Sequence, residues 1–168
     1  LQGVNACTDC SPGYYASSTG TPTCLSCSGG QYSAAKSNGC SKCNSGQYSA
    51  SSSSSCTICP TGYSSGSTAP SCPICQAGTI SSAGASACSN CVVGKYQSSA
   101  GKGTCPNCEV GKYQNTEKST SCTNCIGGQY QRSTGMTGCV LCDVGYTTTG
   151  SSFPYTGCQA CEKGTYAK

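Results

Sequence analysis

The residues of this chain that could do chemistry are its cysteines, and they come in pairs. The 168 residues include 20 cysteines and no histidine, and every cysteine falls in a C-x-x-C pair, as in CTNCIGGQY from Cys122 to Tyr130. Cysteine thiolates bind zinc, close pairs of cysteines act as redox centres, and oxidised cysteines cross-link a chain. The pairs alone therefore permit a metal site, a redox site or a disulfide framework.

The pairs divide residues 1–168 into one continuous array of about ten repeats of 16–19 residues. A short fixed period is typical of linear arrays in which each repeat contacts its neighbours. Helical periodicity is absent, and Ser, Thr and Gly fill the segments between the pairs, so we expect short β-hairpins and loops with little or no helix. The repeats start at Cys7, Cys24, Cys40, Cys56, Cys72, Cys88, Cys105, Cys122, Cys139 and Cys158.

The composition predicts a small disulfide-rich repeat protein, an elongated linear array without a conventional hydrophobic core. The chain has one Phe, one Met and no Trp. Burial of apolar area gains about 25 cal/mol per Å2, which here cannot offset a backbone entropy cost of about 1–2 kcal/mol per residue. Cross-links must supply the difference, and an even number of cysteines in such a chain indicates disulfides and an extracellular or cell-surface location.

A glycine follows the second cysteine of every pair at the same distance, three residues on. Such regularity within one chain predicts a tight turn at positive φ, which glycine adopts without steric cost. The turn glycines are Gly13, Gly30, Gly46, Gly62, Gly78, Gly94, Gly111, Gly128, Gly145 and Gly164.

Two residues after the glycine there is usually a tyrosine, and we expect it to pack against the disulfides and the next repeat. The alternative is a residue of high β-propensity that begins a short strand. The tyrosines are Tyr15, Tyr32, Tyr48, Tyr96, Tyr113, Tyr130 and Tyr166, whereas Ser64, Ile80 and Thr147 take this position in the other repeats.

Three ways of using the cysteines compete. A disulfide within each C-x-x-C would make ten redox sites, but no thioredoxin-like βαβ pattern surrounds them. Four-cysteine zinc sites would need two adjacent pairs each; the absence of His, the few basic residues and the likeness of odd and even repeats weigh against them. A disulfide from the second cysteine of one pair to the first of the next would close a local loop in every repeat.

The pattern C-x-x-C-x-x-G-x-Y, a Ser/Thr-rich stretch and the next C-x-x-C resembles the ephrin-receptor-like cysteine-rich repeat, over Cys7 to Tyr166. It is also similar to the first loop module of tumour-necrosis-factor-receptor cysteine-rich domains. The resemblance implies stacked extracellular loops, although the second modules of those receptors are lacking. It also implies the disulfides Cys10–Cys24, Cys27–Cys40, Cys43–Cys56, Cys59–Cys72, Cys75–Cys88, Cys91–Cys105, Cys108–Cys122, Cys125–Cys139 and Cys142–Cys158, with Cys7 and Cys161 bonded to neighbouring units of a longer chain.

These features favour a structural component of an extracellular filament, surface hair or stalk, which associates with itself or with other filament subunits. The alternative is a receptor or adhesin ectodomain that binds a protein or a glycan, with the insert at Phe153, Pro154 and Tyr155 as its contact surface. A zinc-binding protein is the third possibility.

Other classes lack the residues that they need. Nine basic and five acidic residues form no run of like charge, so we expect no nucleic acid partner. No apolar stretch approaches the roughly 20 residues of a membrane span. Without histidine and with few carboxylates, we expect neither enzymatic acid–base chemistry nor a cofactor.

Hydroxyl side chains are abundant in the loops, and we expect covalent glycans on some of them. There is no N-x-S/T sequon, which favours O-glycosylation at clustered hydroxyls and beside proline. The candidates are Thr21, Thr23, Ser51, Ser52, Ser53, Ser54, Ser55, Thr68, Thr147, Thr148 and Thr149.

Overall fold

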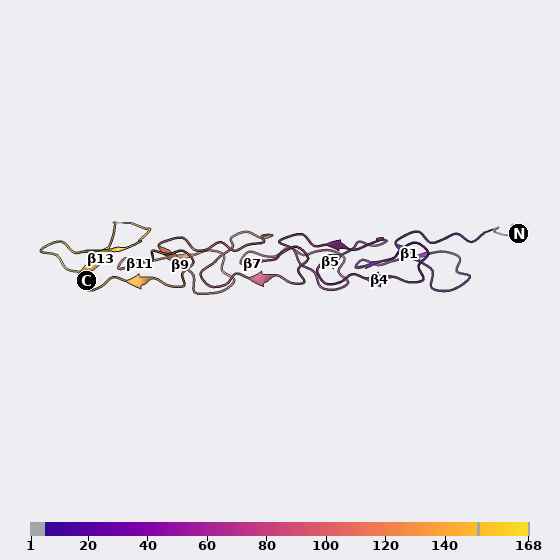
Figure 1. Cartoon of the computed structure of the whole chain (residues 1–168), viewed down its shortest axis with the longest axis horizontal. Helices are drawn as coiled ribbons and strands as arrows, with labels where there is room; N and C mark the ends of the chain where they lie inside the picture. Colours follow the sequence, from indigo (N-terminus) through magenta and orange to yellow (C-terminus); the bar gives the residue numbers. More distant parts are fainter. Residues whose placement is uncertain (1–5, 151, 168) are drawn as a thin grey trace. The chain divides into compact units, whose positions relative to one another are not determined.

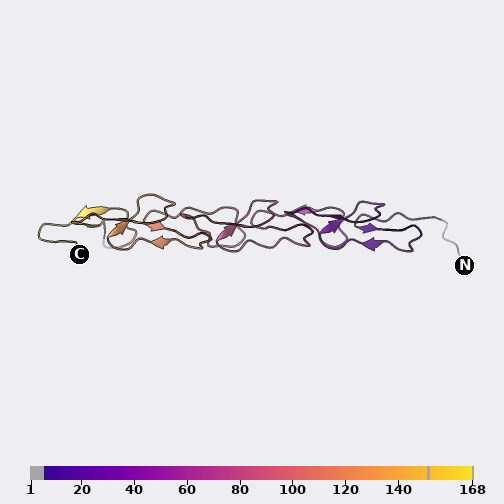
Figure 2. The same cartoon turned by 90° about the horizontal axis from the view of Figure 1, so that it is seen from below.

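The regular structure of the chain consists of short β-hairpins. The structure, a computed structural model, describes residues 6–150 and 152–167. Within them the strands are two or three residues long and pair antiparallel into seven two-stranded sheets. Neither view of the described residues contains a helix (Figures 1 and 2). The prediction of a disulfide-rich array of small hairpins without helix is confirmed.

Each sheet joins two strands that are consecutive in the sequence. The strands are β1 (Tyr14–Tyr15), β2 (Leu25–Ser26), β3 (Gln31–Tyr32), β4 (Ser41–Lys42), β5 (Gln47–Tyr48), β6 (Thr57–Ile58), β7 (Thr79–Ile80), β8 (Ser89–Asn90), β9 (Lys112–Tyr113), β10 (Thr123–Asn124), β11 (Gln129–Tyr130), β12 (Val140–Leu141), β13 (Tyr146–Thr148) and β14 (Cys158–Ala160).

The repeat pattern explains where each hairpin begins and ends. The first strand starts directly after the turn glycine. The second follows the first cysteine of the next pair, except that β14 begins at that cysteine, Cys158. In the pair β3–β4, Gln31 lies opposite Lys42 and Tyr32 lies opposite Ser41. Tyrosine has a high β-propensity, and a disulfide ties the base of the hairpin. Two-residue strands would not persist on their own, so the cross-link and the neighbouring repeats must hold them.

Two repeats lack a full ladder because proline occupies the second strand. Pro73 and Pro106 take the position that serine, threonine, leucine, valine or glutamine has elsewhere. Proline accepts a backbone hydrogen bond but cannot donate one. Accordingly, Ser64 N–H donates to the Pro73 carbonyl and Tyr96 N–H to the Pro106 carbonyl, both at 3.1 Å. Only isolated bridges remain there, of which Tyr63–Ile74 is one.

The chain divides into two compact units. Unit 1 comprises residues 1–74 and 81–88, and unit 2 comprises residues 75–80 and 89–168. Within unit 1 the hairpins β1–β2, β3–β4 and β5–β6 follow one another in chain order, and within unit 2 the hairpins β7–β8 to β13–β14 do so (Figure 1).

Sulfur takes the place of an apolar core. The buried hydrophobic side chains of the described residues are the second cysteines of the pairs: Cys10, Cys27, Cys43, Cys59, Cys75, Cys91, Cys108 and Cys125. Leucine, isoleucine and valine side chains are largely exposed, with Val144 fully so. Within the described residues there is no helix with the length and apolarity that a membrane crossing requires.

Candidate functional site

The contact between successive repeats is the most regular feature of the molecule, and it is built on the turn glycines. Gly30 has a φ of +80°, and its N–H donates to the Ser49 carbonyl of the next repeat at 2.8 Å. A Cβ on Gly30 would overlap the backbone of Thr68, which belongs to the second repeat along. Glycine is therefore required here both by its φ and by the close approach of another backbone.

The same notch recurs wherever two further repeats follow within a unit. In unit 1, a Cβ on Gly13 would overlap Ser52 and one on Gly46 would overlap Gly84. In unit 2, Gly78 meets Lys118 and Gly94 meets Gly135 in the same way. We call this feature the glycine notch: a turn glycine whose missing side chain leaves room for the backbone of the second repeat along.

All ten sequence-predicted turn glycines have positive φ, between +75° and +85°. They differ in what lies against them. Gly128, Gly145 and Gly164 have no atom of the described residues within 4 Å of a built Cβ.

The residue that fills a notch is the tip of a loop, and it also has positive φ. Ser52 has a φ of +59°, and its N–H donates to the Cys27 carbonyl of the preceding repeat at 2.9 Å. Eight loop tips have positive φ: Gly20, Lys36, Ser52, Thr68, Gly84, Gly101, Lys118 and Gly135. Of these, Ser52, Thr68, Gly84, Lys118 and Gly135 fill a notch. Sequence reasoning missed them because four of the eight are not glycine, so residue type carries no common signal.

Disulfides close the loops. The structure contains the bonds Cys10–Cys24, Cys27–Cys40, Cys43–Cys56, Cys59–Cys72, Cys91–Cys105, Cys108–Cys122, Cys125–Cys139 and Cys142–Cys158. Cys75 and Cys88 are disulfide-bonded as well. Among the described residues, Cys7 and Cys161 have free thiols. A cysteine in a disulfide offers no thiolate to a metal ion, and no cluster of three potential metal ligands occurs in the described part of the chain.

The tyrosine position links neighbouring repeats through its backbone. Tyr15 forms a parallel bridge to Ser37, Tyr32 to Ser53 and Tyr48 to Ala69. Their side chains are half-buried. Tyr166 is exposed.

The residue after the tyrosine is buried and polar, and it separates two kinds of loop. In the first kind it is serine, and the Ser33 hydroxyl donates to the Tyr14 carbonyl of the preceding repeat at 3.0 Å. Ser49, Ser65 and Ser81 make the same bond. The disulfides that close the loops of Ser33, Ser49 and Ser65 join cysteines 13 residues apart in sequence.

In the second kind of loop the buried residue is glutamine, which bonds within its own loop. Gln114 Nε2 donates to the Ser121 carbonyl at 2.8 Å, and Gln114 Oε1 accepts from the Thr116 N–H at 3.1 Å. Gln97 and Gln131 make equivalent bonds. The disulfides here join cysteines 14 residues apart. The longer side chain thus accompanies the longer loop.

The aromatic insert packs onto the array. Pro154 and Phe153 lie against Gly111, whose Cβ would be 2.8 Å from Pro154 Cβ. The Lys112 ammonium lies 5.6 Å from the centre of the Phe153 ring, and Gln131 N–H donates to the Tyr155 carbonyl at 3.1 Å. The insert therefore fills the notch of Gly111 as a loop tip does elsewhere, and Phe153 and Tyr155 are both half-buried.

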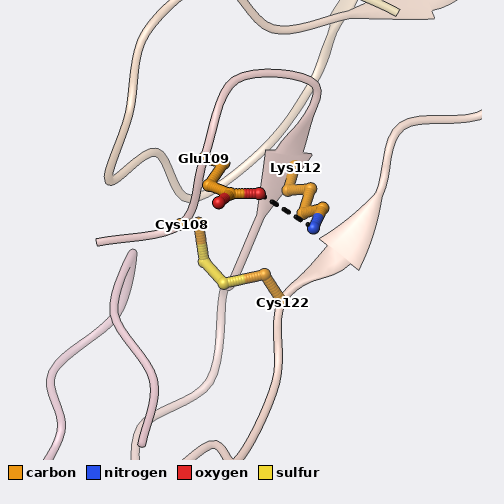
Figure 3. Close-up of polar contacts among 4 residues, drawn as sticks. All are labelled: Cys108, Glu109, Lys112 and Cys122. Atoms are coloured by element: carbon orange, nitrogen blue, oxygen red, sulfur yellow. Dashed lines mark hydrogen bonds and ion pairs between the residues drawn. A yellow bond between two sulfur atoms is a disulfide. The ribbon is translucent and has the colours of Figure 1, made fainter. Parts of the chain in front are cut away.

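Charged groups form few contacts. Glu109 and Lys112 make an ion pair of 3.1 Å next to the Cys108–Cys122 disulfide (Figure 3). Lys36 and Asp9 make another of 2.9 Å with both side chains exposed. Exposed pairs contribute little to stability, so the repeat contact rests on backbone and sulfur.

The candidate glycosylation sites differ in exposure. Thr148 is 7% exposed, too little for a glycan. Ser52, Ser53, Thr68 and Thr149 are half-buried. Thr21, Thr23, Ser51, Ser54, Ser55 and Thr147 are exposed.

Comparison with known proteins gives one family. The family model described as tyrosine-protein kinase ephrin type A/B receptor-like matches residues 78–121 and again residues 94–137. The two matches are offset by 16 residues, the length of one repeat, as expected for a tandem array. No curated protein matches the chain. Such repeats and so many disulfides are typical of an extracellular or cell-surface protein. Residues 78–137 thus match ephrin-receptor-like cysteine-rich repeats, in agreement with the resemblance that the sequence indicates.

Proposed function

We propose that this chain is a structural component of an extracellular filament, surface hair or stalk. The observation that carries the proposal is the uniformity of the repeat contact. In both units a turn-glycine N–H donates to a carbonyl of the next repeat, as Gly13 does to Ser33 and Gly111 to Gln131. Backbone and disulfide contacts that repeat unchanged are suited to building length.

The side chains that vary between repeats support the same proposal. Recognition sites concentrate aromatic and charged side chains at one exposed place. Here the single Phe is half-buried against Gly111 and Lys112, and ion pairs are sparse. A disulfide-closed loop also resists proteolysis, because opening it requires chemistry as well as unfolding.

O-glycans are part of the proposal. The exposed hydroxyls Thr21, Thr23, Ser51, Ser54, Ser55 and Thr147 are the candidate attachment sites. The chain has only nine basic and five acidic side chains. Sugars on these loops would therefore make its surface better solvated.

The experiment that tests this function is localisation of the native protein. Antibodies against the chain, with gold labels, should decorate a filament, hair or stalk outside the cell at regular intervals. Mass spectrometry of the same material should give hexose or other glycan masses on peptides with the six exposed hydroxyls. Label on a dispersed membrane receptor, or inside the cell, would contradict the proposal.

A further inference from the structure

A groove with the same lining pattern occurs at two places in unit 2, two repeats apart. It is lined by a tyrosine two residues after a turn glycine, and by an acidic residue directly after the second cysteine of the next pair. The residue after the next turn glycine and the first cysteine of the pair beyond line it as well. In the Glu109 groove, of about 150 Å3, these residues are Tyr96, Glu109, Lys112 and Cys122. In the Asp143 groove, of about 230 Å3, they are Tyr130, Asp143, Tyr146 and Cys158.

Such a groove stays open when further repeats follow it. The repeats that begin at Cys139 and Cys158 follow the Glu109 groove within unit 2, and the groove remains accessible beside them. Tyr14 has the same repeat position as Tyr146, directly after its turn glycine. It is 38% exposed with the later repeats of unit 1 in place, and Tyr146 is 45% exposed. The Asp143 groove therefore does not owe its openness to a missing neighbour.

The two grooves differ in whether their acidic group is paired. In the Glu109 groove, the Glu109 carboxylate accepts a hydrogen bond of 3.1 Å from the Lys112 ammonium, next to the Cys108–Cys122 disulfide (Figure 3). In the Asp143 groove, Tyr146 takes the place of Lys112. The Asp143 side chain is exposed, and its carboxylate has no ion pair or hydrogen bond within the described part of the chain. Its acceptor oxygens are therefore available to a ligand.

A guanidinium that is fixed in position also lines the Asp143 groove, that of Arg132. It lies 5.1 Å from the centre of the Tyr130 ring, and its Nε donates to the Thr156 carbonyl at 3.3 Å. A Cβ on Gly157 would be 3.3 Å from its Nη2, so the glycine gives the guanidinium its room. The Nη groups have no acceptor among the described residues. A donor held in place in this way loses little entropy when it binds a ligand.

We propose that the Asp143 groove binds one sugar ring of a glycan. Arg132 supplies donors and Asp143 supplies acceptors for the hydroxyls of the sugar, and the exposed Tyr146 ring offers an apolar face to its C–H groups. The two charges balance, which favours a neutral ligand over an anion or a cation. The groove is smaller than the roughly 300–1,000 Å3 of sites for drug-sized ligands, and this limits the ligand to about one ring. The inference goes beyond the proposed structural function and does not depend on it.

The site is tested by NMR titration of the purified, isotope-labelled and disulfide-bonded chain with the methyl glycosides of glucose, galactose, mannose, xylose and arabinose. At least one glycoside should shift the Arg132 Nε–H and the Tyr146 amide saturably, with a Kd on the order of 1–10 mM, as a ligand of one ring allows.

Two variants and a control identify the binding groups. Asp143→Ala removes the acceptors without removing a contact of the fold, and it should weaken binding by at least about tenfold. Arg132→Lys keeps the charge but loses the planar donors, and it should weaken binding by about fivefold or more. Glu117→Ala is the matched control, because it removes an exposed carboxylate that lines neither groove; it should bind within about twofold of the wild type.

The source of the sugar is distinguished by sedimentation of the native, glycosylated chain. Self-association that the binding glycoside reverses and that Asp143→Ala lacks would assign the ring to an O-glycan on another copy of this chain. A monomeric chain that sediments with polysaccharide extracted from its native surface, and does not do so as Asp143→Ala, would assign the ring to that polysaccharide. Both outcomes support the sugar site.

Three results of the titration would overturn the inference. The first is the absence of a saturable shift with every glycoside, and the second is equal binding by the wild type and Asp143→Ala. The third is a shift of the Asp143 amide by a tetralysine peptide together with no response to any glycoside, since this would assign the groove to a basic segment of a protein.

Discussion

The side-chain amide of Gln114 donates a hydrogen bond of 2.8 Å to the carbonyl of Ser121, across a loop whose cysteines are 14 residues apart. Serine takes the same buried position in loops whose cysteines are 13 residues apart. The buried polar residue and the loop length are therefore coupled.

Gln114→Ser should destabilise its loop by about 1–3 kcal/mol, because a serine hydroxyl cannot reach both the Ser121 carbonyl and the Thr116 N–H. Hydrogen exchange measures this locally, and the Thr116 amide should exchange at least about tenfold faster. Gln129→Ser, in half-buried β11, is the control and should leave the Thr116 amide unchanged. Unchanged exchange in Gln114→Ser would show that loop length alone sets the structure.

Gly30→Ala should lower the free energy of unfolding by about 3 kcal/mol or more, since strain at φ +80° adds to overlap with the Thr68 backbone. Two controls separate these effects in guanidinium unfolding. Gly128 has a φ of +81° but open space around its built Cβ, so Gly128→Ala should lower the free energy of unfolding by about 1–2 kcal/mol. Gly39→Ala has open space as well and should cost less than about 0.5 kcal/mol. Equal costs in Gly30→Ala and Gly128→Ala would contradict the notch.

Reduction of the disulfides should unfold the chain. Each loop of about 15 residues contributes roughly 3 kcal/mol through its cross-link, and the buried side chains that remain are mostly small and polar. Circular dichroism and limited proteolysis before and after treatment with a thiol reductant measure the effect. The control is the disulfide-bonded chain treated with an alkylating reagent and no reductant. Only the free thiols of Cys7 and Cys161 should react with that reagent. Persistent protease resistance after full reduction would require another source of stability.

Phe153→Ala should destabilise the insert by about 1–2 kcal/mol, because the half-buried ring packs on Gly111 and the Lys112 ammonium. Exchange of the Gln131 amide, which bonds the Tyr155 carbonyl, reports the change. Tyr166→Ala, at a residue that is 77% exposed, should have no effect on that amide. Loss of cell adhesion or of partner binding in Phe153→Ala, with the Gln131 amide unaffected, would instead favour a receptor or adhesin.

The hairpins and turn glycines were accessible from sequence because a single residue type marks them. Only glycine adopts φ near +80° next to another backbone without cost, so its recurrence beside each C-x-x-C carries structural information. The two-residue strands follow from the tyrosine and from the disulfide that holds the strands together.

The loop tips were not accessible in the same way. Lys36, Ser52, Thr68 and Lys118 have positive φ although none is glycine, and what holds them there is a hydrogen bond from their own N–H to a cysteine carbonyl of the preceding repeat. The fit of Phe153 and Pro154 to Gly111 likewise depends on a contact between repeats. Long-range contacts of this kind leave no local pattern in residue type.

A turn glycine contacts the backbone of the loop two repeats further along the chain, and this contact limits how such a sequence can change. Gly13 contacts the Ser52 backbone two repeats along the chain and also forms a hydrogen bond with Ser33 in the intervening repeat. Three consecutive repeats therefore form the smallest complete set of contacts. Duplication or loss of an entire repeat preserves these contacts and changes only the number of repeats in the array. A one-residue insertion between a cysteine and its turn glycine would move that glycine away from its contacts with the next two loops. Such insertions should therefore be far rarer among natural variants than the gain or loss of whole repeats.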